Sequence, residues 1–180
     1  MTDPNRQTVD LSNYPDLVIV RAGMRAESVK GFWKLIKYGY QIIDSVGGVR
    51  DSDELTPEGL LHNEEVIFSL LPPHFIIRQY WRDFDSLEEW TQTGTHRELW
   101  DELAESPEGT SFWHELYSRD GIEAVYNGMD DSPIGMLNFA PTQLVCGDLS
   151  SARDRLQKSE NIDISSPLLP DDSVSDDVSE

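Results

Sequence analysis

The sequence has a single cysteine, Cys146, and no long hydrophobic run. One cysteine excludes an internal disulfide framework and leaves no cysteine cluster that could hold a metal. No stretch reaches the roughly 18 consecutive apolar residues that a membrane-spanning helix needs. The N-terminus also lacks the charged-then-apolar order of a signal peptide. We therefore expect a cytoplasmic protein without a membrane partner.

Basic residues are scarce, because 14 Lys and Arg stand against 34 Asp and Glu and give a formal net charge of −20. Residues 16–148 alone hold 24 acids and 10 bases, so this part carries −14. A nucleic-acid partner is disfavoured, since affinity for phosphates comes from Lys and Arg. A generic acidic protein and a halophilic one both fit. We favour the halophile, because screening over about 3 Å in molar salt relieves such self-repulsion.

The chain divides into three parts by composition. Residues 1–14 are polar without a period and predict a flexible N-terminal arm. Residues 15–148 predict a single domain. Residues 149–180 predict a short helix, from Ser150 to Gln157, followed by an acidic disordered tail that has too little apolar surface to fold.

Hydrophobic periodicity within the domain predicts the order β-α-β-β-α-β, with strands at 16–25, 62–71, 74–84 and 111–118. Two capping-box sequences, Asp85–Glu88 and Thr95–Glu98, flank Gly94 and predict a break in the second helix. The order is that of the ferredoxin-like α+β sandwich, an antiparallel sheet with its first strand beside the third and fourth. Helices cover one face of such a sheet, and we expect a second copy of the chain to cover the other.

Two later segments are less regular. Residues 121–129 fit either a continuation of the fourth strand or a short hairpin arm. Residues 133–149 are apolar in patches and are expected to cover an edge of the sheet.

One face of the predicted sheet collects polar and aromatic side chains, because side chains alternate across each strand. Its members are Arg21, Arg78, Tyr80, Trp113, Glu115 and Tyr117. The group fits an ion network that is satisfied internally or an anion-binding pocket. A register slip by one residue would replace Glu115 with His114 on this face.

His96 lies on the apolar stripe of the second helix, at helical spacing with Leu99, Trp100 and Leu103. A core histidine and a catalytic one both fit this position. The catalytic interpretation draws on the helix break just before it and on the titration of imidazole near neutral pH. No serine-hydrolase elbow, phosphate-binding glycine loop or H-E-x-x-H zinc motif occurs, and no metal site is predicted.

Several segments carry a resemblance to a known superfamily: VIVRAGMR, PEGLL, IIRQYWRDFDSLEEW, THRELW and WHELYSRDGIEAVYNGM. They resemble the dimeric α+β barrel superfamily, and within it a monooxygenase-like branch related to the antibiotic-biosynthesis-type monooxygenases. The resemblance covers residues 14–140. It implies a homodimer whose sheets face each other, with a pocket between sheet and helices in each subunit.

The resemblance also bears on cofactors. Haem-degrading members take an axial histidine from the second helix, which His96 matches by position, but Arg21 and Met24 stand where their companion asparagine would be. Aldoxime dehydratases share a related fold and a haem histidine in a much longer chain. We therefore expect no cofactor, with haem as the less favoured alternative.

From the resemblance we predict a small monooxygenase-like oxidoreductase that acts on an aromatic or planar molecule. In this prediction His96 or Glu115 accepts a proton, and two guanidinium groups stabilise an anion or enolate. The predicted substrate-binding residues are Arg21, Arg78, Tyr80, Trp113 and Tyr117. The alternative is a non-catalytic dimer that binds a small molecule or serves a structural role.

Overall fold

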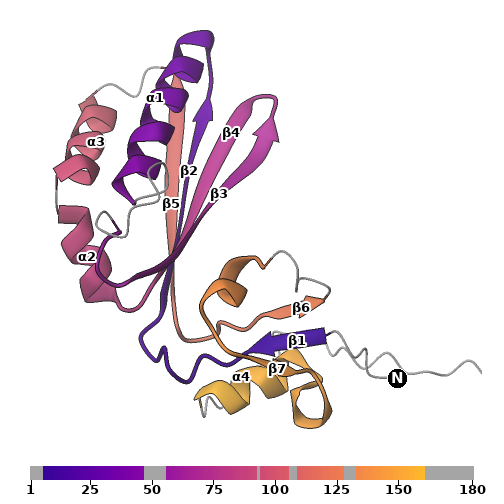
Figure 1. The fold of residues 1–180 in the computed structure, drawn as a ribbon. Coiled ribbons are helices and arrows are strands. Elements are labelled where there is room, and N and C mark those ends of the chain that lie inside the picture. Colours follow the sequence, from indigo (N-terminus) through magenta and orange to yellow (C-terminus); the bar gives the residue numbers. More distant parts are fainter. Residues whose placement is uncertain (1–5, 47–55, 93, 106–108, 128–132, 161–180) are drawn as a thin grey trace, which may run out of the picture.

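The structure, a computed structural model, describes residues 6–46, 56–92, 94–105, 109–127 and 133–160. Its main sheet is antiparallel and has the order β3-β4-β2-β5, and three helices lie on one side of it (Figure 1). The strands are β2 (Val18–Ala26), β3 (Leu60–Leu70), β4 (Pro73–Trp81) and β5 (Thr110–Ser118). The helices are α1 (Val29–Ser45), α2 (Phe84–Gln92) and α3 (Gly94–Glu105). The predicted ferredoxin-like α+β fold is confirmed, and the described strands form an open sheet.

The register of the three strand pairings in the main sheet matches the predicted faces. Strand β2 pairs Arg21 with Arg78 on one side and with Glu115 on the other. Strand β3 adds Glu64 opposite Arg78. These four side chains therefore share the face that points away from the helices, because aligned residues in paired strands point the same way.

The second helical segment is broken where the sequence predicts. Helix α2 ends at Gln92 and α3 begins at Gly94, whose φ of +33° lies in the left-handed region. The cap of α2 differs from the prediction, because Asp83 Oδ1 accepts the backbone N–H of Ser86 over 2.8 Å. The Arg82 side chain and Ser86 lower the pKa of Asp83 to about 2. The helix begins earlier than the capping box at Asp85 indicates, since a charged acceptor already satisfies its first turn.

A small second sheet was not predicted. Its order is β6-β1-β7, from β1 (Arg6–Val9), β6 (Val125–Asn127) and β7 (Thr142–Leu144). Thr8 and Val9 are buried in it, so the predicted flexible arm is wrong for residues 6–9, whose backbone is paired on both edges. Neither interpretation of residues 121–129 fits the described part, residues 121–127, since β6 pairs with β1; residues 128 and 129 lie outside the described residues. The predicted C-terminal helix is present as α4 (Ala152–Glu160), and residues 161–180 lie outside the described residues.

The second sheet and the short 3-10 helix η2 (Gly135–Asn138) cover one end of the face opposite the long helix α1 (Figure 1). Met136 and Ala140 pack there against Ile19 and Tyr80 of the main sheet. The chain itself therefore buries part of the surface that we expected a second copy to cover.

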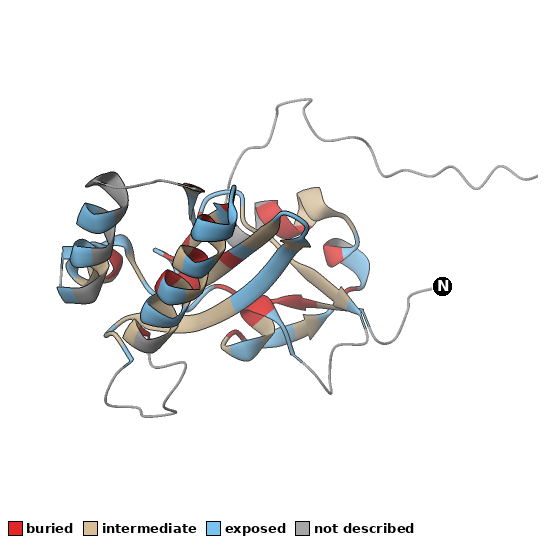
Figure 2. Cartoon of the chain, turned by 90° about the horizontal axis from the view of Figure 1, so that it is seen from above, coloured by how far each residue is buried: buried red, intermediate tan, exposed pale blue. Residues whose placement is uncertain are grey.

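A separate apolar cluster lies under α2, where Val18, Trp81 and Leu87 are buried together. The outer sides of α1 and α3 carry exposed residues (Figure 2). Among the described residues, no helix combines the length and the apolar character needed to cross a membrane.

Candidate functional site

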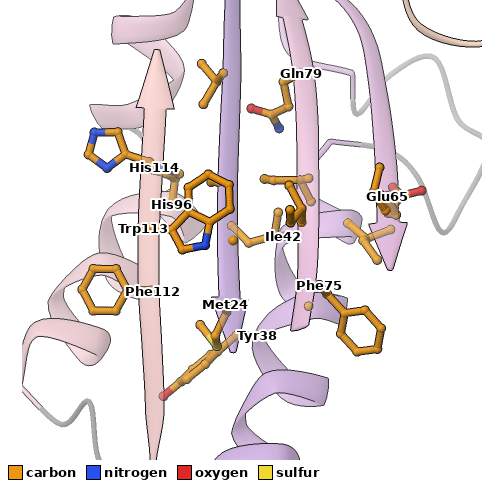
Figure 3. Close-up of a pocket in the computed structure, with 18 of the residues that line it drawn as sticks. Met24, Tyr38, Ile42, Glu65, Phe75, Gln79, His96, Phe112, Trp113 and His114 are labelled. Atoms are coloured by element: carbon orange, nitrogen blue, oxygen red, sulfur yellow. The ribbon is translucent and has the colours of Figure 1, made fainter. Parts of the chain in front are cut away.

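A cavity of about 730 Å³ lies between the main sheet and helices α1, α2 and α3 (Figure 3). Its volume is in the range of small-molecule sites. Its walls are largely aliphatic and aromatic, and they include Met24, Ile42, Phe75, Phe112 and Trp90. Neither Lys nor Arg occurs among the described residues that line it. The cavity therefore suits an uncharged, mostly apolar molecule.

His96 lines this cavity from the first turn of α3, directly after the helix break. Its Nδ1 lies 3.1 Å from the carbonyl oxygen of Thr91, and its ring centroid lies 4.5 Å from that of Trp90. A carbonyl oxygen only accepts hydrogen bonds, so Nδ1 carries the proton in this contact. In a neutral imidazole, Nε2 is then the nitrogen with an acceptor lone pair.

Burial is the main cause that lowers the pKa of His96 below its ordinary value. The contact with Thr91 acts against this shift, and the charge of His114 adds to it. The imidazole is consequently held in its neutral form near neutral pH, which is the form that can accept a proton from a bound molecule.

Gln79 is a second polar group at the cavity and is not among the predicted site residues. Its side chain on β4 is only 1% exposed, and Oε1 accepts a hydrogen bond of 3.3 Å from Trp81 Nε1. The amide Nε2 is buried and has no hydrogen-bond partner among the described residues. The signal in the sequence is that Gln79 stands between Ile77 and Trp81 on an otherwise apolar strand face.

The other predicted site residues lie on the opposite face of the sheet. Arg21 Nη1 is 3.6 Å from Glu115 Oε2, and the Tyr117 hydroxyl donates to the same oxygen over 2.6 Å. The structure thus brings these three residues together, but it separates them from His96 by the thickness of the sheet. Glu115 and His96 do not share one site.

Arg78 belongs to a network that joins the main sheet to η2. Its Nε donates to Glu64 Oε2 over 2.7 Å, and the backbone N–H of Gly135 donates to Glu64 Oε1 over 2.5 Å. Tyr80 lies beside it and is 2% exposed. Both predicted guanidinium groups therefore already face a carboxylate, which favours the internally satisfied network over an anion pocket.

Trp113 is the only one of the five predicted substrate-binding residues that also lines the cavity, within the part of the chain described. Its indole lies over Gly23, where a Cβ would be 2.6 Å from the ring. The indole Nε1 donates to His74 Nε2 over 3.0 Å. Because Gly23 has no side chain, the Trp113 indole can occupy the space above this residue.

The described lining suits haem poorly. Haem carries two carboxylates, and the lining residues of the described chain offer the imidazole of His96 but no Lys or Arg to pair with them. No group of three His, Cys, Asp or Glu side chains in the described ranges could hold a metal ion.

Comparison with known proteins gives a family and a fold. A family model described as "Monooxygenase af470-like" matches residues 17–136. No curated protein matches the sequence. An aldoxime dehydratase in complex with butyraldoxime aligns with 88% of this chain and 44% of its own, at a TM-score of 0.66 and 15% identity. This chain therefore spans less than half of that protein.

Two smaller proteins also align with part of this chain. SnoaB, a cofactor-independent oxygenase from Streptomyces nogalater, is 9% identical over 57% of this chain and 91% of its own, with a TM-score of 0.40. A putative antibiotic biosynthesis monooxygenase from Deinococcus radiodurans is 16% identical over 55% of this chain and 89% of its own, with a TM-score of 0.41.

Proposed function

Because this chain belongs to the monooxygenase af470-like family, we propose that it is a small monooxygenase-like enzyme acting on an aromatic or planar molecule in the cavity between sheet and helices. The observation that carries the proposal is the position of His96, a half-buried imidazole held neutral at the wall of an apolar cavity. A group in this state can remove a proton from a substrate O–H or an acidic C–H.

The proposed reaction uses dioxygen as oxidant and needs no added cofactor. His96 accepts a proton from a CH2 group that an adjacent carbonyl makes acidic. The substrate carbon then takes one oxygen atom and becomes a carbonyl, and the two hydrogens leave with the second oxygen atom as water. The substrate supplies all the electrons, so atoms and charge balance without a further reductant.

The test is turnover by the His96→Asn variant, because asparagine keeps an N–H for the Thr91 carbonyl but has no basic nitrogen. With aromatic ketones that carry acidic CH2 groups as substrates, we expect kcat/KM to fall about 100-fold or more. The melting temperature should stay close to that of the wild type. The matched control is His114→Asn, which removes the exposed imidazole that lines the cavity from β5 and should have a smaller effect.

A non-catalytic small-molecule-binding protein is the second candidate. The ring contact between Trp90 and His96 favours it, since a histidine packed against an indole also serves as a core residue. This alternative predicts that His96→Asn changes the melting temperature and leaves any oxidation rate at background. If His96→Asn and His114→Asn oxidise the ketones at equal rates, the proposal of an enzyme is rejected and the binding protein remains.

We also propose that the chain forms a homodimer in a halophilic cytoplasm. The charge of −20 supports the salt-rich setting, since such charge is tolerated where salt screens it. Exposed apolar side chains on the β3–β4 hairpin support self-association, namely Ile67, Phe68, Leu70 and Leu71. Light scattering in molar KCl tests the dimer, and a monomer at all protein concentrations would exclude it.

A further inference from the structure

We propose that Gln79 orients the ligand of the cavity by donating a hydrogen bond from Nε2. The ligand class that follows is an uncharged, mostly apolar molecule with one acceptor oxygen, such as a ring carbonyl. The inference rests on the proposed function in one respect, that the cavity is the ligand site. It adds the hydrogen-bond donor, Gln79, and the kind of ligand group that accepts the bond.

Trp81 fixes the orientation of the Gln79 amide. The indole Nε1 is a donor only, so the atom 3.3 Å away from it must be the amide oxygen. Trp81 is 0% exposed and Gln79 is 1% exposed, so the amide cannot turn out to solvent. The NH2 end therefore stays inside the protein, at the wall of the cavity (Figure 3).

The NH2 end is unsatisfied within the part of the chain that the structure describes. Buried polar groups nearly always have a partner, because an unmade hydrogen bond in an apolar interior costs free energy. An acceptor oxygen of a bound molecule would provide that partner. A fully buried donor at an apolar cavity is consequently a feature that a ligand explains.

A second buried amide offers a competing explanation. Asn63 pairs with Gln79 across β3 and β4, and its Oδ1 is also buried without a partner among the described residues. The Asn63 Nδ2 donates to Glu65 Oε1 over 2.7 Å, and Asn63 does not line this cavity. If the two amides served only each other, their removal would affect stability together and would leave ligand binding unchanged.

The surroundings of Gln79 define the ligand further. The only carboxylates among the described lining residues, Glu65 and Glu88, are exposed and would repel an anion. The ring centroids of Trp81 and Trp90 lie 5.3 Å apart, and those of Trp90 and His96 lie 4.5 Å apart. Trp90 and His96 line the cavity together with Gln79, whereas Trp81 is buried outside the lining. A planar ligand can therefore pack against an aromatic wall while the amide donates to its oxygen.

The experiment compares two probes that differ by one carbonyl, 1-tetralone and tetralin, by equilibrium dialysis. Gln79→Met keeps length and apolar contact but has no N–H, and we expect it to weaken 1-tetralone binding about five- to tenfold. Tetralin binding should stay within twofold of the wild type, about the precision of the measurement. Asn63→Leu is the control, because it removes the neighbouring amide and should leave both affinities unchanged.

A measurement on the wild type makes the result independent of how well Gln79→Met folds. In protein labelled with ¹⁵N at glutamine side chains, the signal missing from Gln79→Met identifies the amide. 1-Tetralone should move its N–H resonance downfield, and tetralin should not.

The outcomes separate the two proposals. Equal tetralone affinities for wild type and Gln79→Met, or an unmoved amide signal in the bound state, would overturn the role of Gln79 and leave the cavity as a ligand site. If the wild type binds neither probe, the cavity is not a site for such molecules, and the proposed function fails together with the inference.

Discussion

The rings of Trp90 and His96 lie 4.5 Å apart between centroids, with their planes inclined by 50°. The contact holds the imidazole against the apolar wall of the cavity, directly after the break between α2 and α3. Burial there is the main reason that the pKa of His96 lies below its ordinary value. Packing at the cavity wall thus favours the neutral form of the imidazole.

The first prediction concerns the pH dependence of stability. Because the pKa of His96 is lower in the folded protein, the unfolded chain takes up the proton first as the pH falls below about 6.5. The contribution of His96 to the free energy of unfolding is therefore fully present above that pH, and it is lost as the pH falls through the folded pKa. His96→Asn should make this acid-side decrease shallower, as thermal unfolding at a series of pH values would show.

His74 limits the size of this effect. Burial, with a smaller contribution from the charge of Arg25, lowers its pKa as well, so it contributes a slope of the same sign. The slope should therefore diminish without vanishing in His96→Asn, and decrease further when His74→Gln is added. An unchanged slope in the single variant would contradict the burial of His96.

The second prediction compares two carboxylates on the face opposite the cavity. Glu64, with 15% of its side chain exposed, binds both Arg78 and the backbone N–H of Gly135. Glu64→Gln removes the negative charge and leaves one acceptor oxygen for these two donors. We expect a loss of about 2 kcal/mol in unfolding free energy, less than for a fully buried pair because 35% of the Arg78 side chain is exposed.

Glu115→Gln is the matched control for Glu64→Gln. Arg21 and Glu115 are 3.6 Å apart, with 38% and 51% of their side chains exposed. Such a pair contributes about 1 kcal/mol or less. Urea unfolding of both variants checks the contrast. A larger loss for Glu115→Gln would mean that the pair with Arg21, and not the link to η2, organises this face.

The third prediction is that salt stabilises the protein. With a formal charge of −20, repulsion among carboxylates opposes the compact state. Raising KCl to about 1 M shortens the screening length to about 3 Å and should raise the melting temperature. Sucrose, which stabilises folded proteins without screening charge, serves as the control. A melting temperature that rises no more in KCl than in sucrose would contradict the halophilic interpretation.

The faces of the main sheet could be predicted from the sequence because the alternation in β2, β4 and β5 is strict. Arg21, Arg78 and Glu115 align as the pattern indicates. The sequence also held the information about which face the helices cover. The face with Val18, Val20 and Ile77 is apolar, and covering the charged face with helices would bury charges at a cost.

Gln79 and the second sheet show where the sequence is less informative. Gln79 is a single polar residue on an apolar face, and only the closeness of Trp81 shows which end of its amide lacks a partner. Strands β1, β6 and β7 are three or four residues long, too short for a clear alternation. Their pairing joins residues more than 100 positions apart, such as Thr8 and Val125, and only tertiary packing decides such contacts.

The fourth prediction uses two glycines of α1 that differ in their surroundings. A Cβ on Gly31 would overlap the carbonyl oxygen of Gly109, just before β5, whereas a Cβ on Gly39 would meet nothing within 4 Å. The Gly109 carbonyl also accepts the backbone N–H of Glu27 over 2.8 Å, so it is held in place.

Alanine normally stabilises a helix relative to glycine by about 1 kcal/mol, and Gly39→Ala should show this gain. Gly31→Ala should instead lower the unfolding free energy by about 1–3 kcal/mol, since the overlap forces α1 away from β5. Urea unfolding of the two variants measures both signs under one condition. If Gly31→Ala were as stabilising as Gly39→Ala, α1 would not approach the sheet this closely, and the helix wall of the cavity would lie farther from β5.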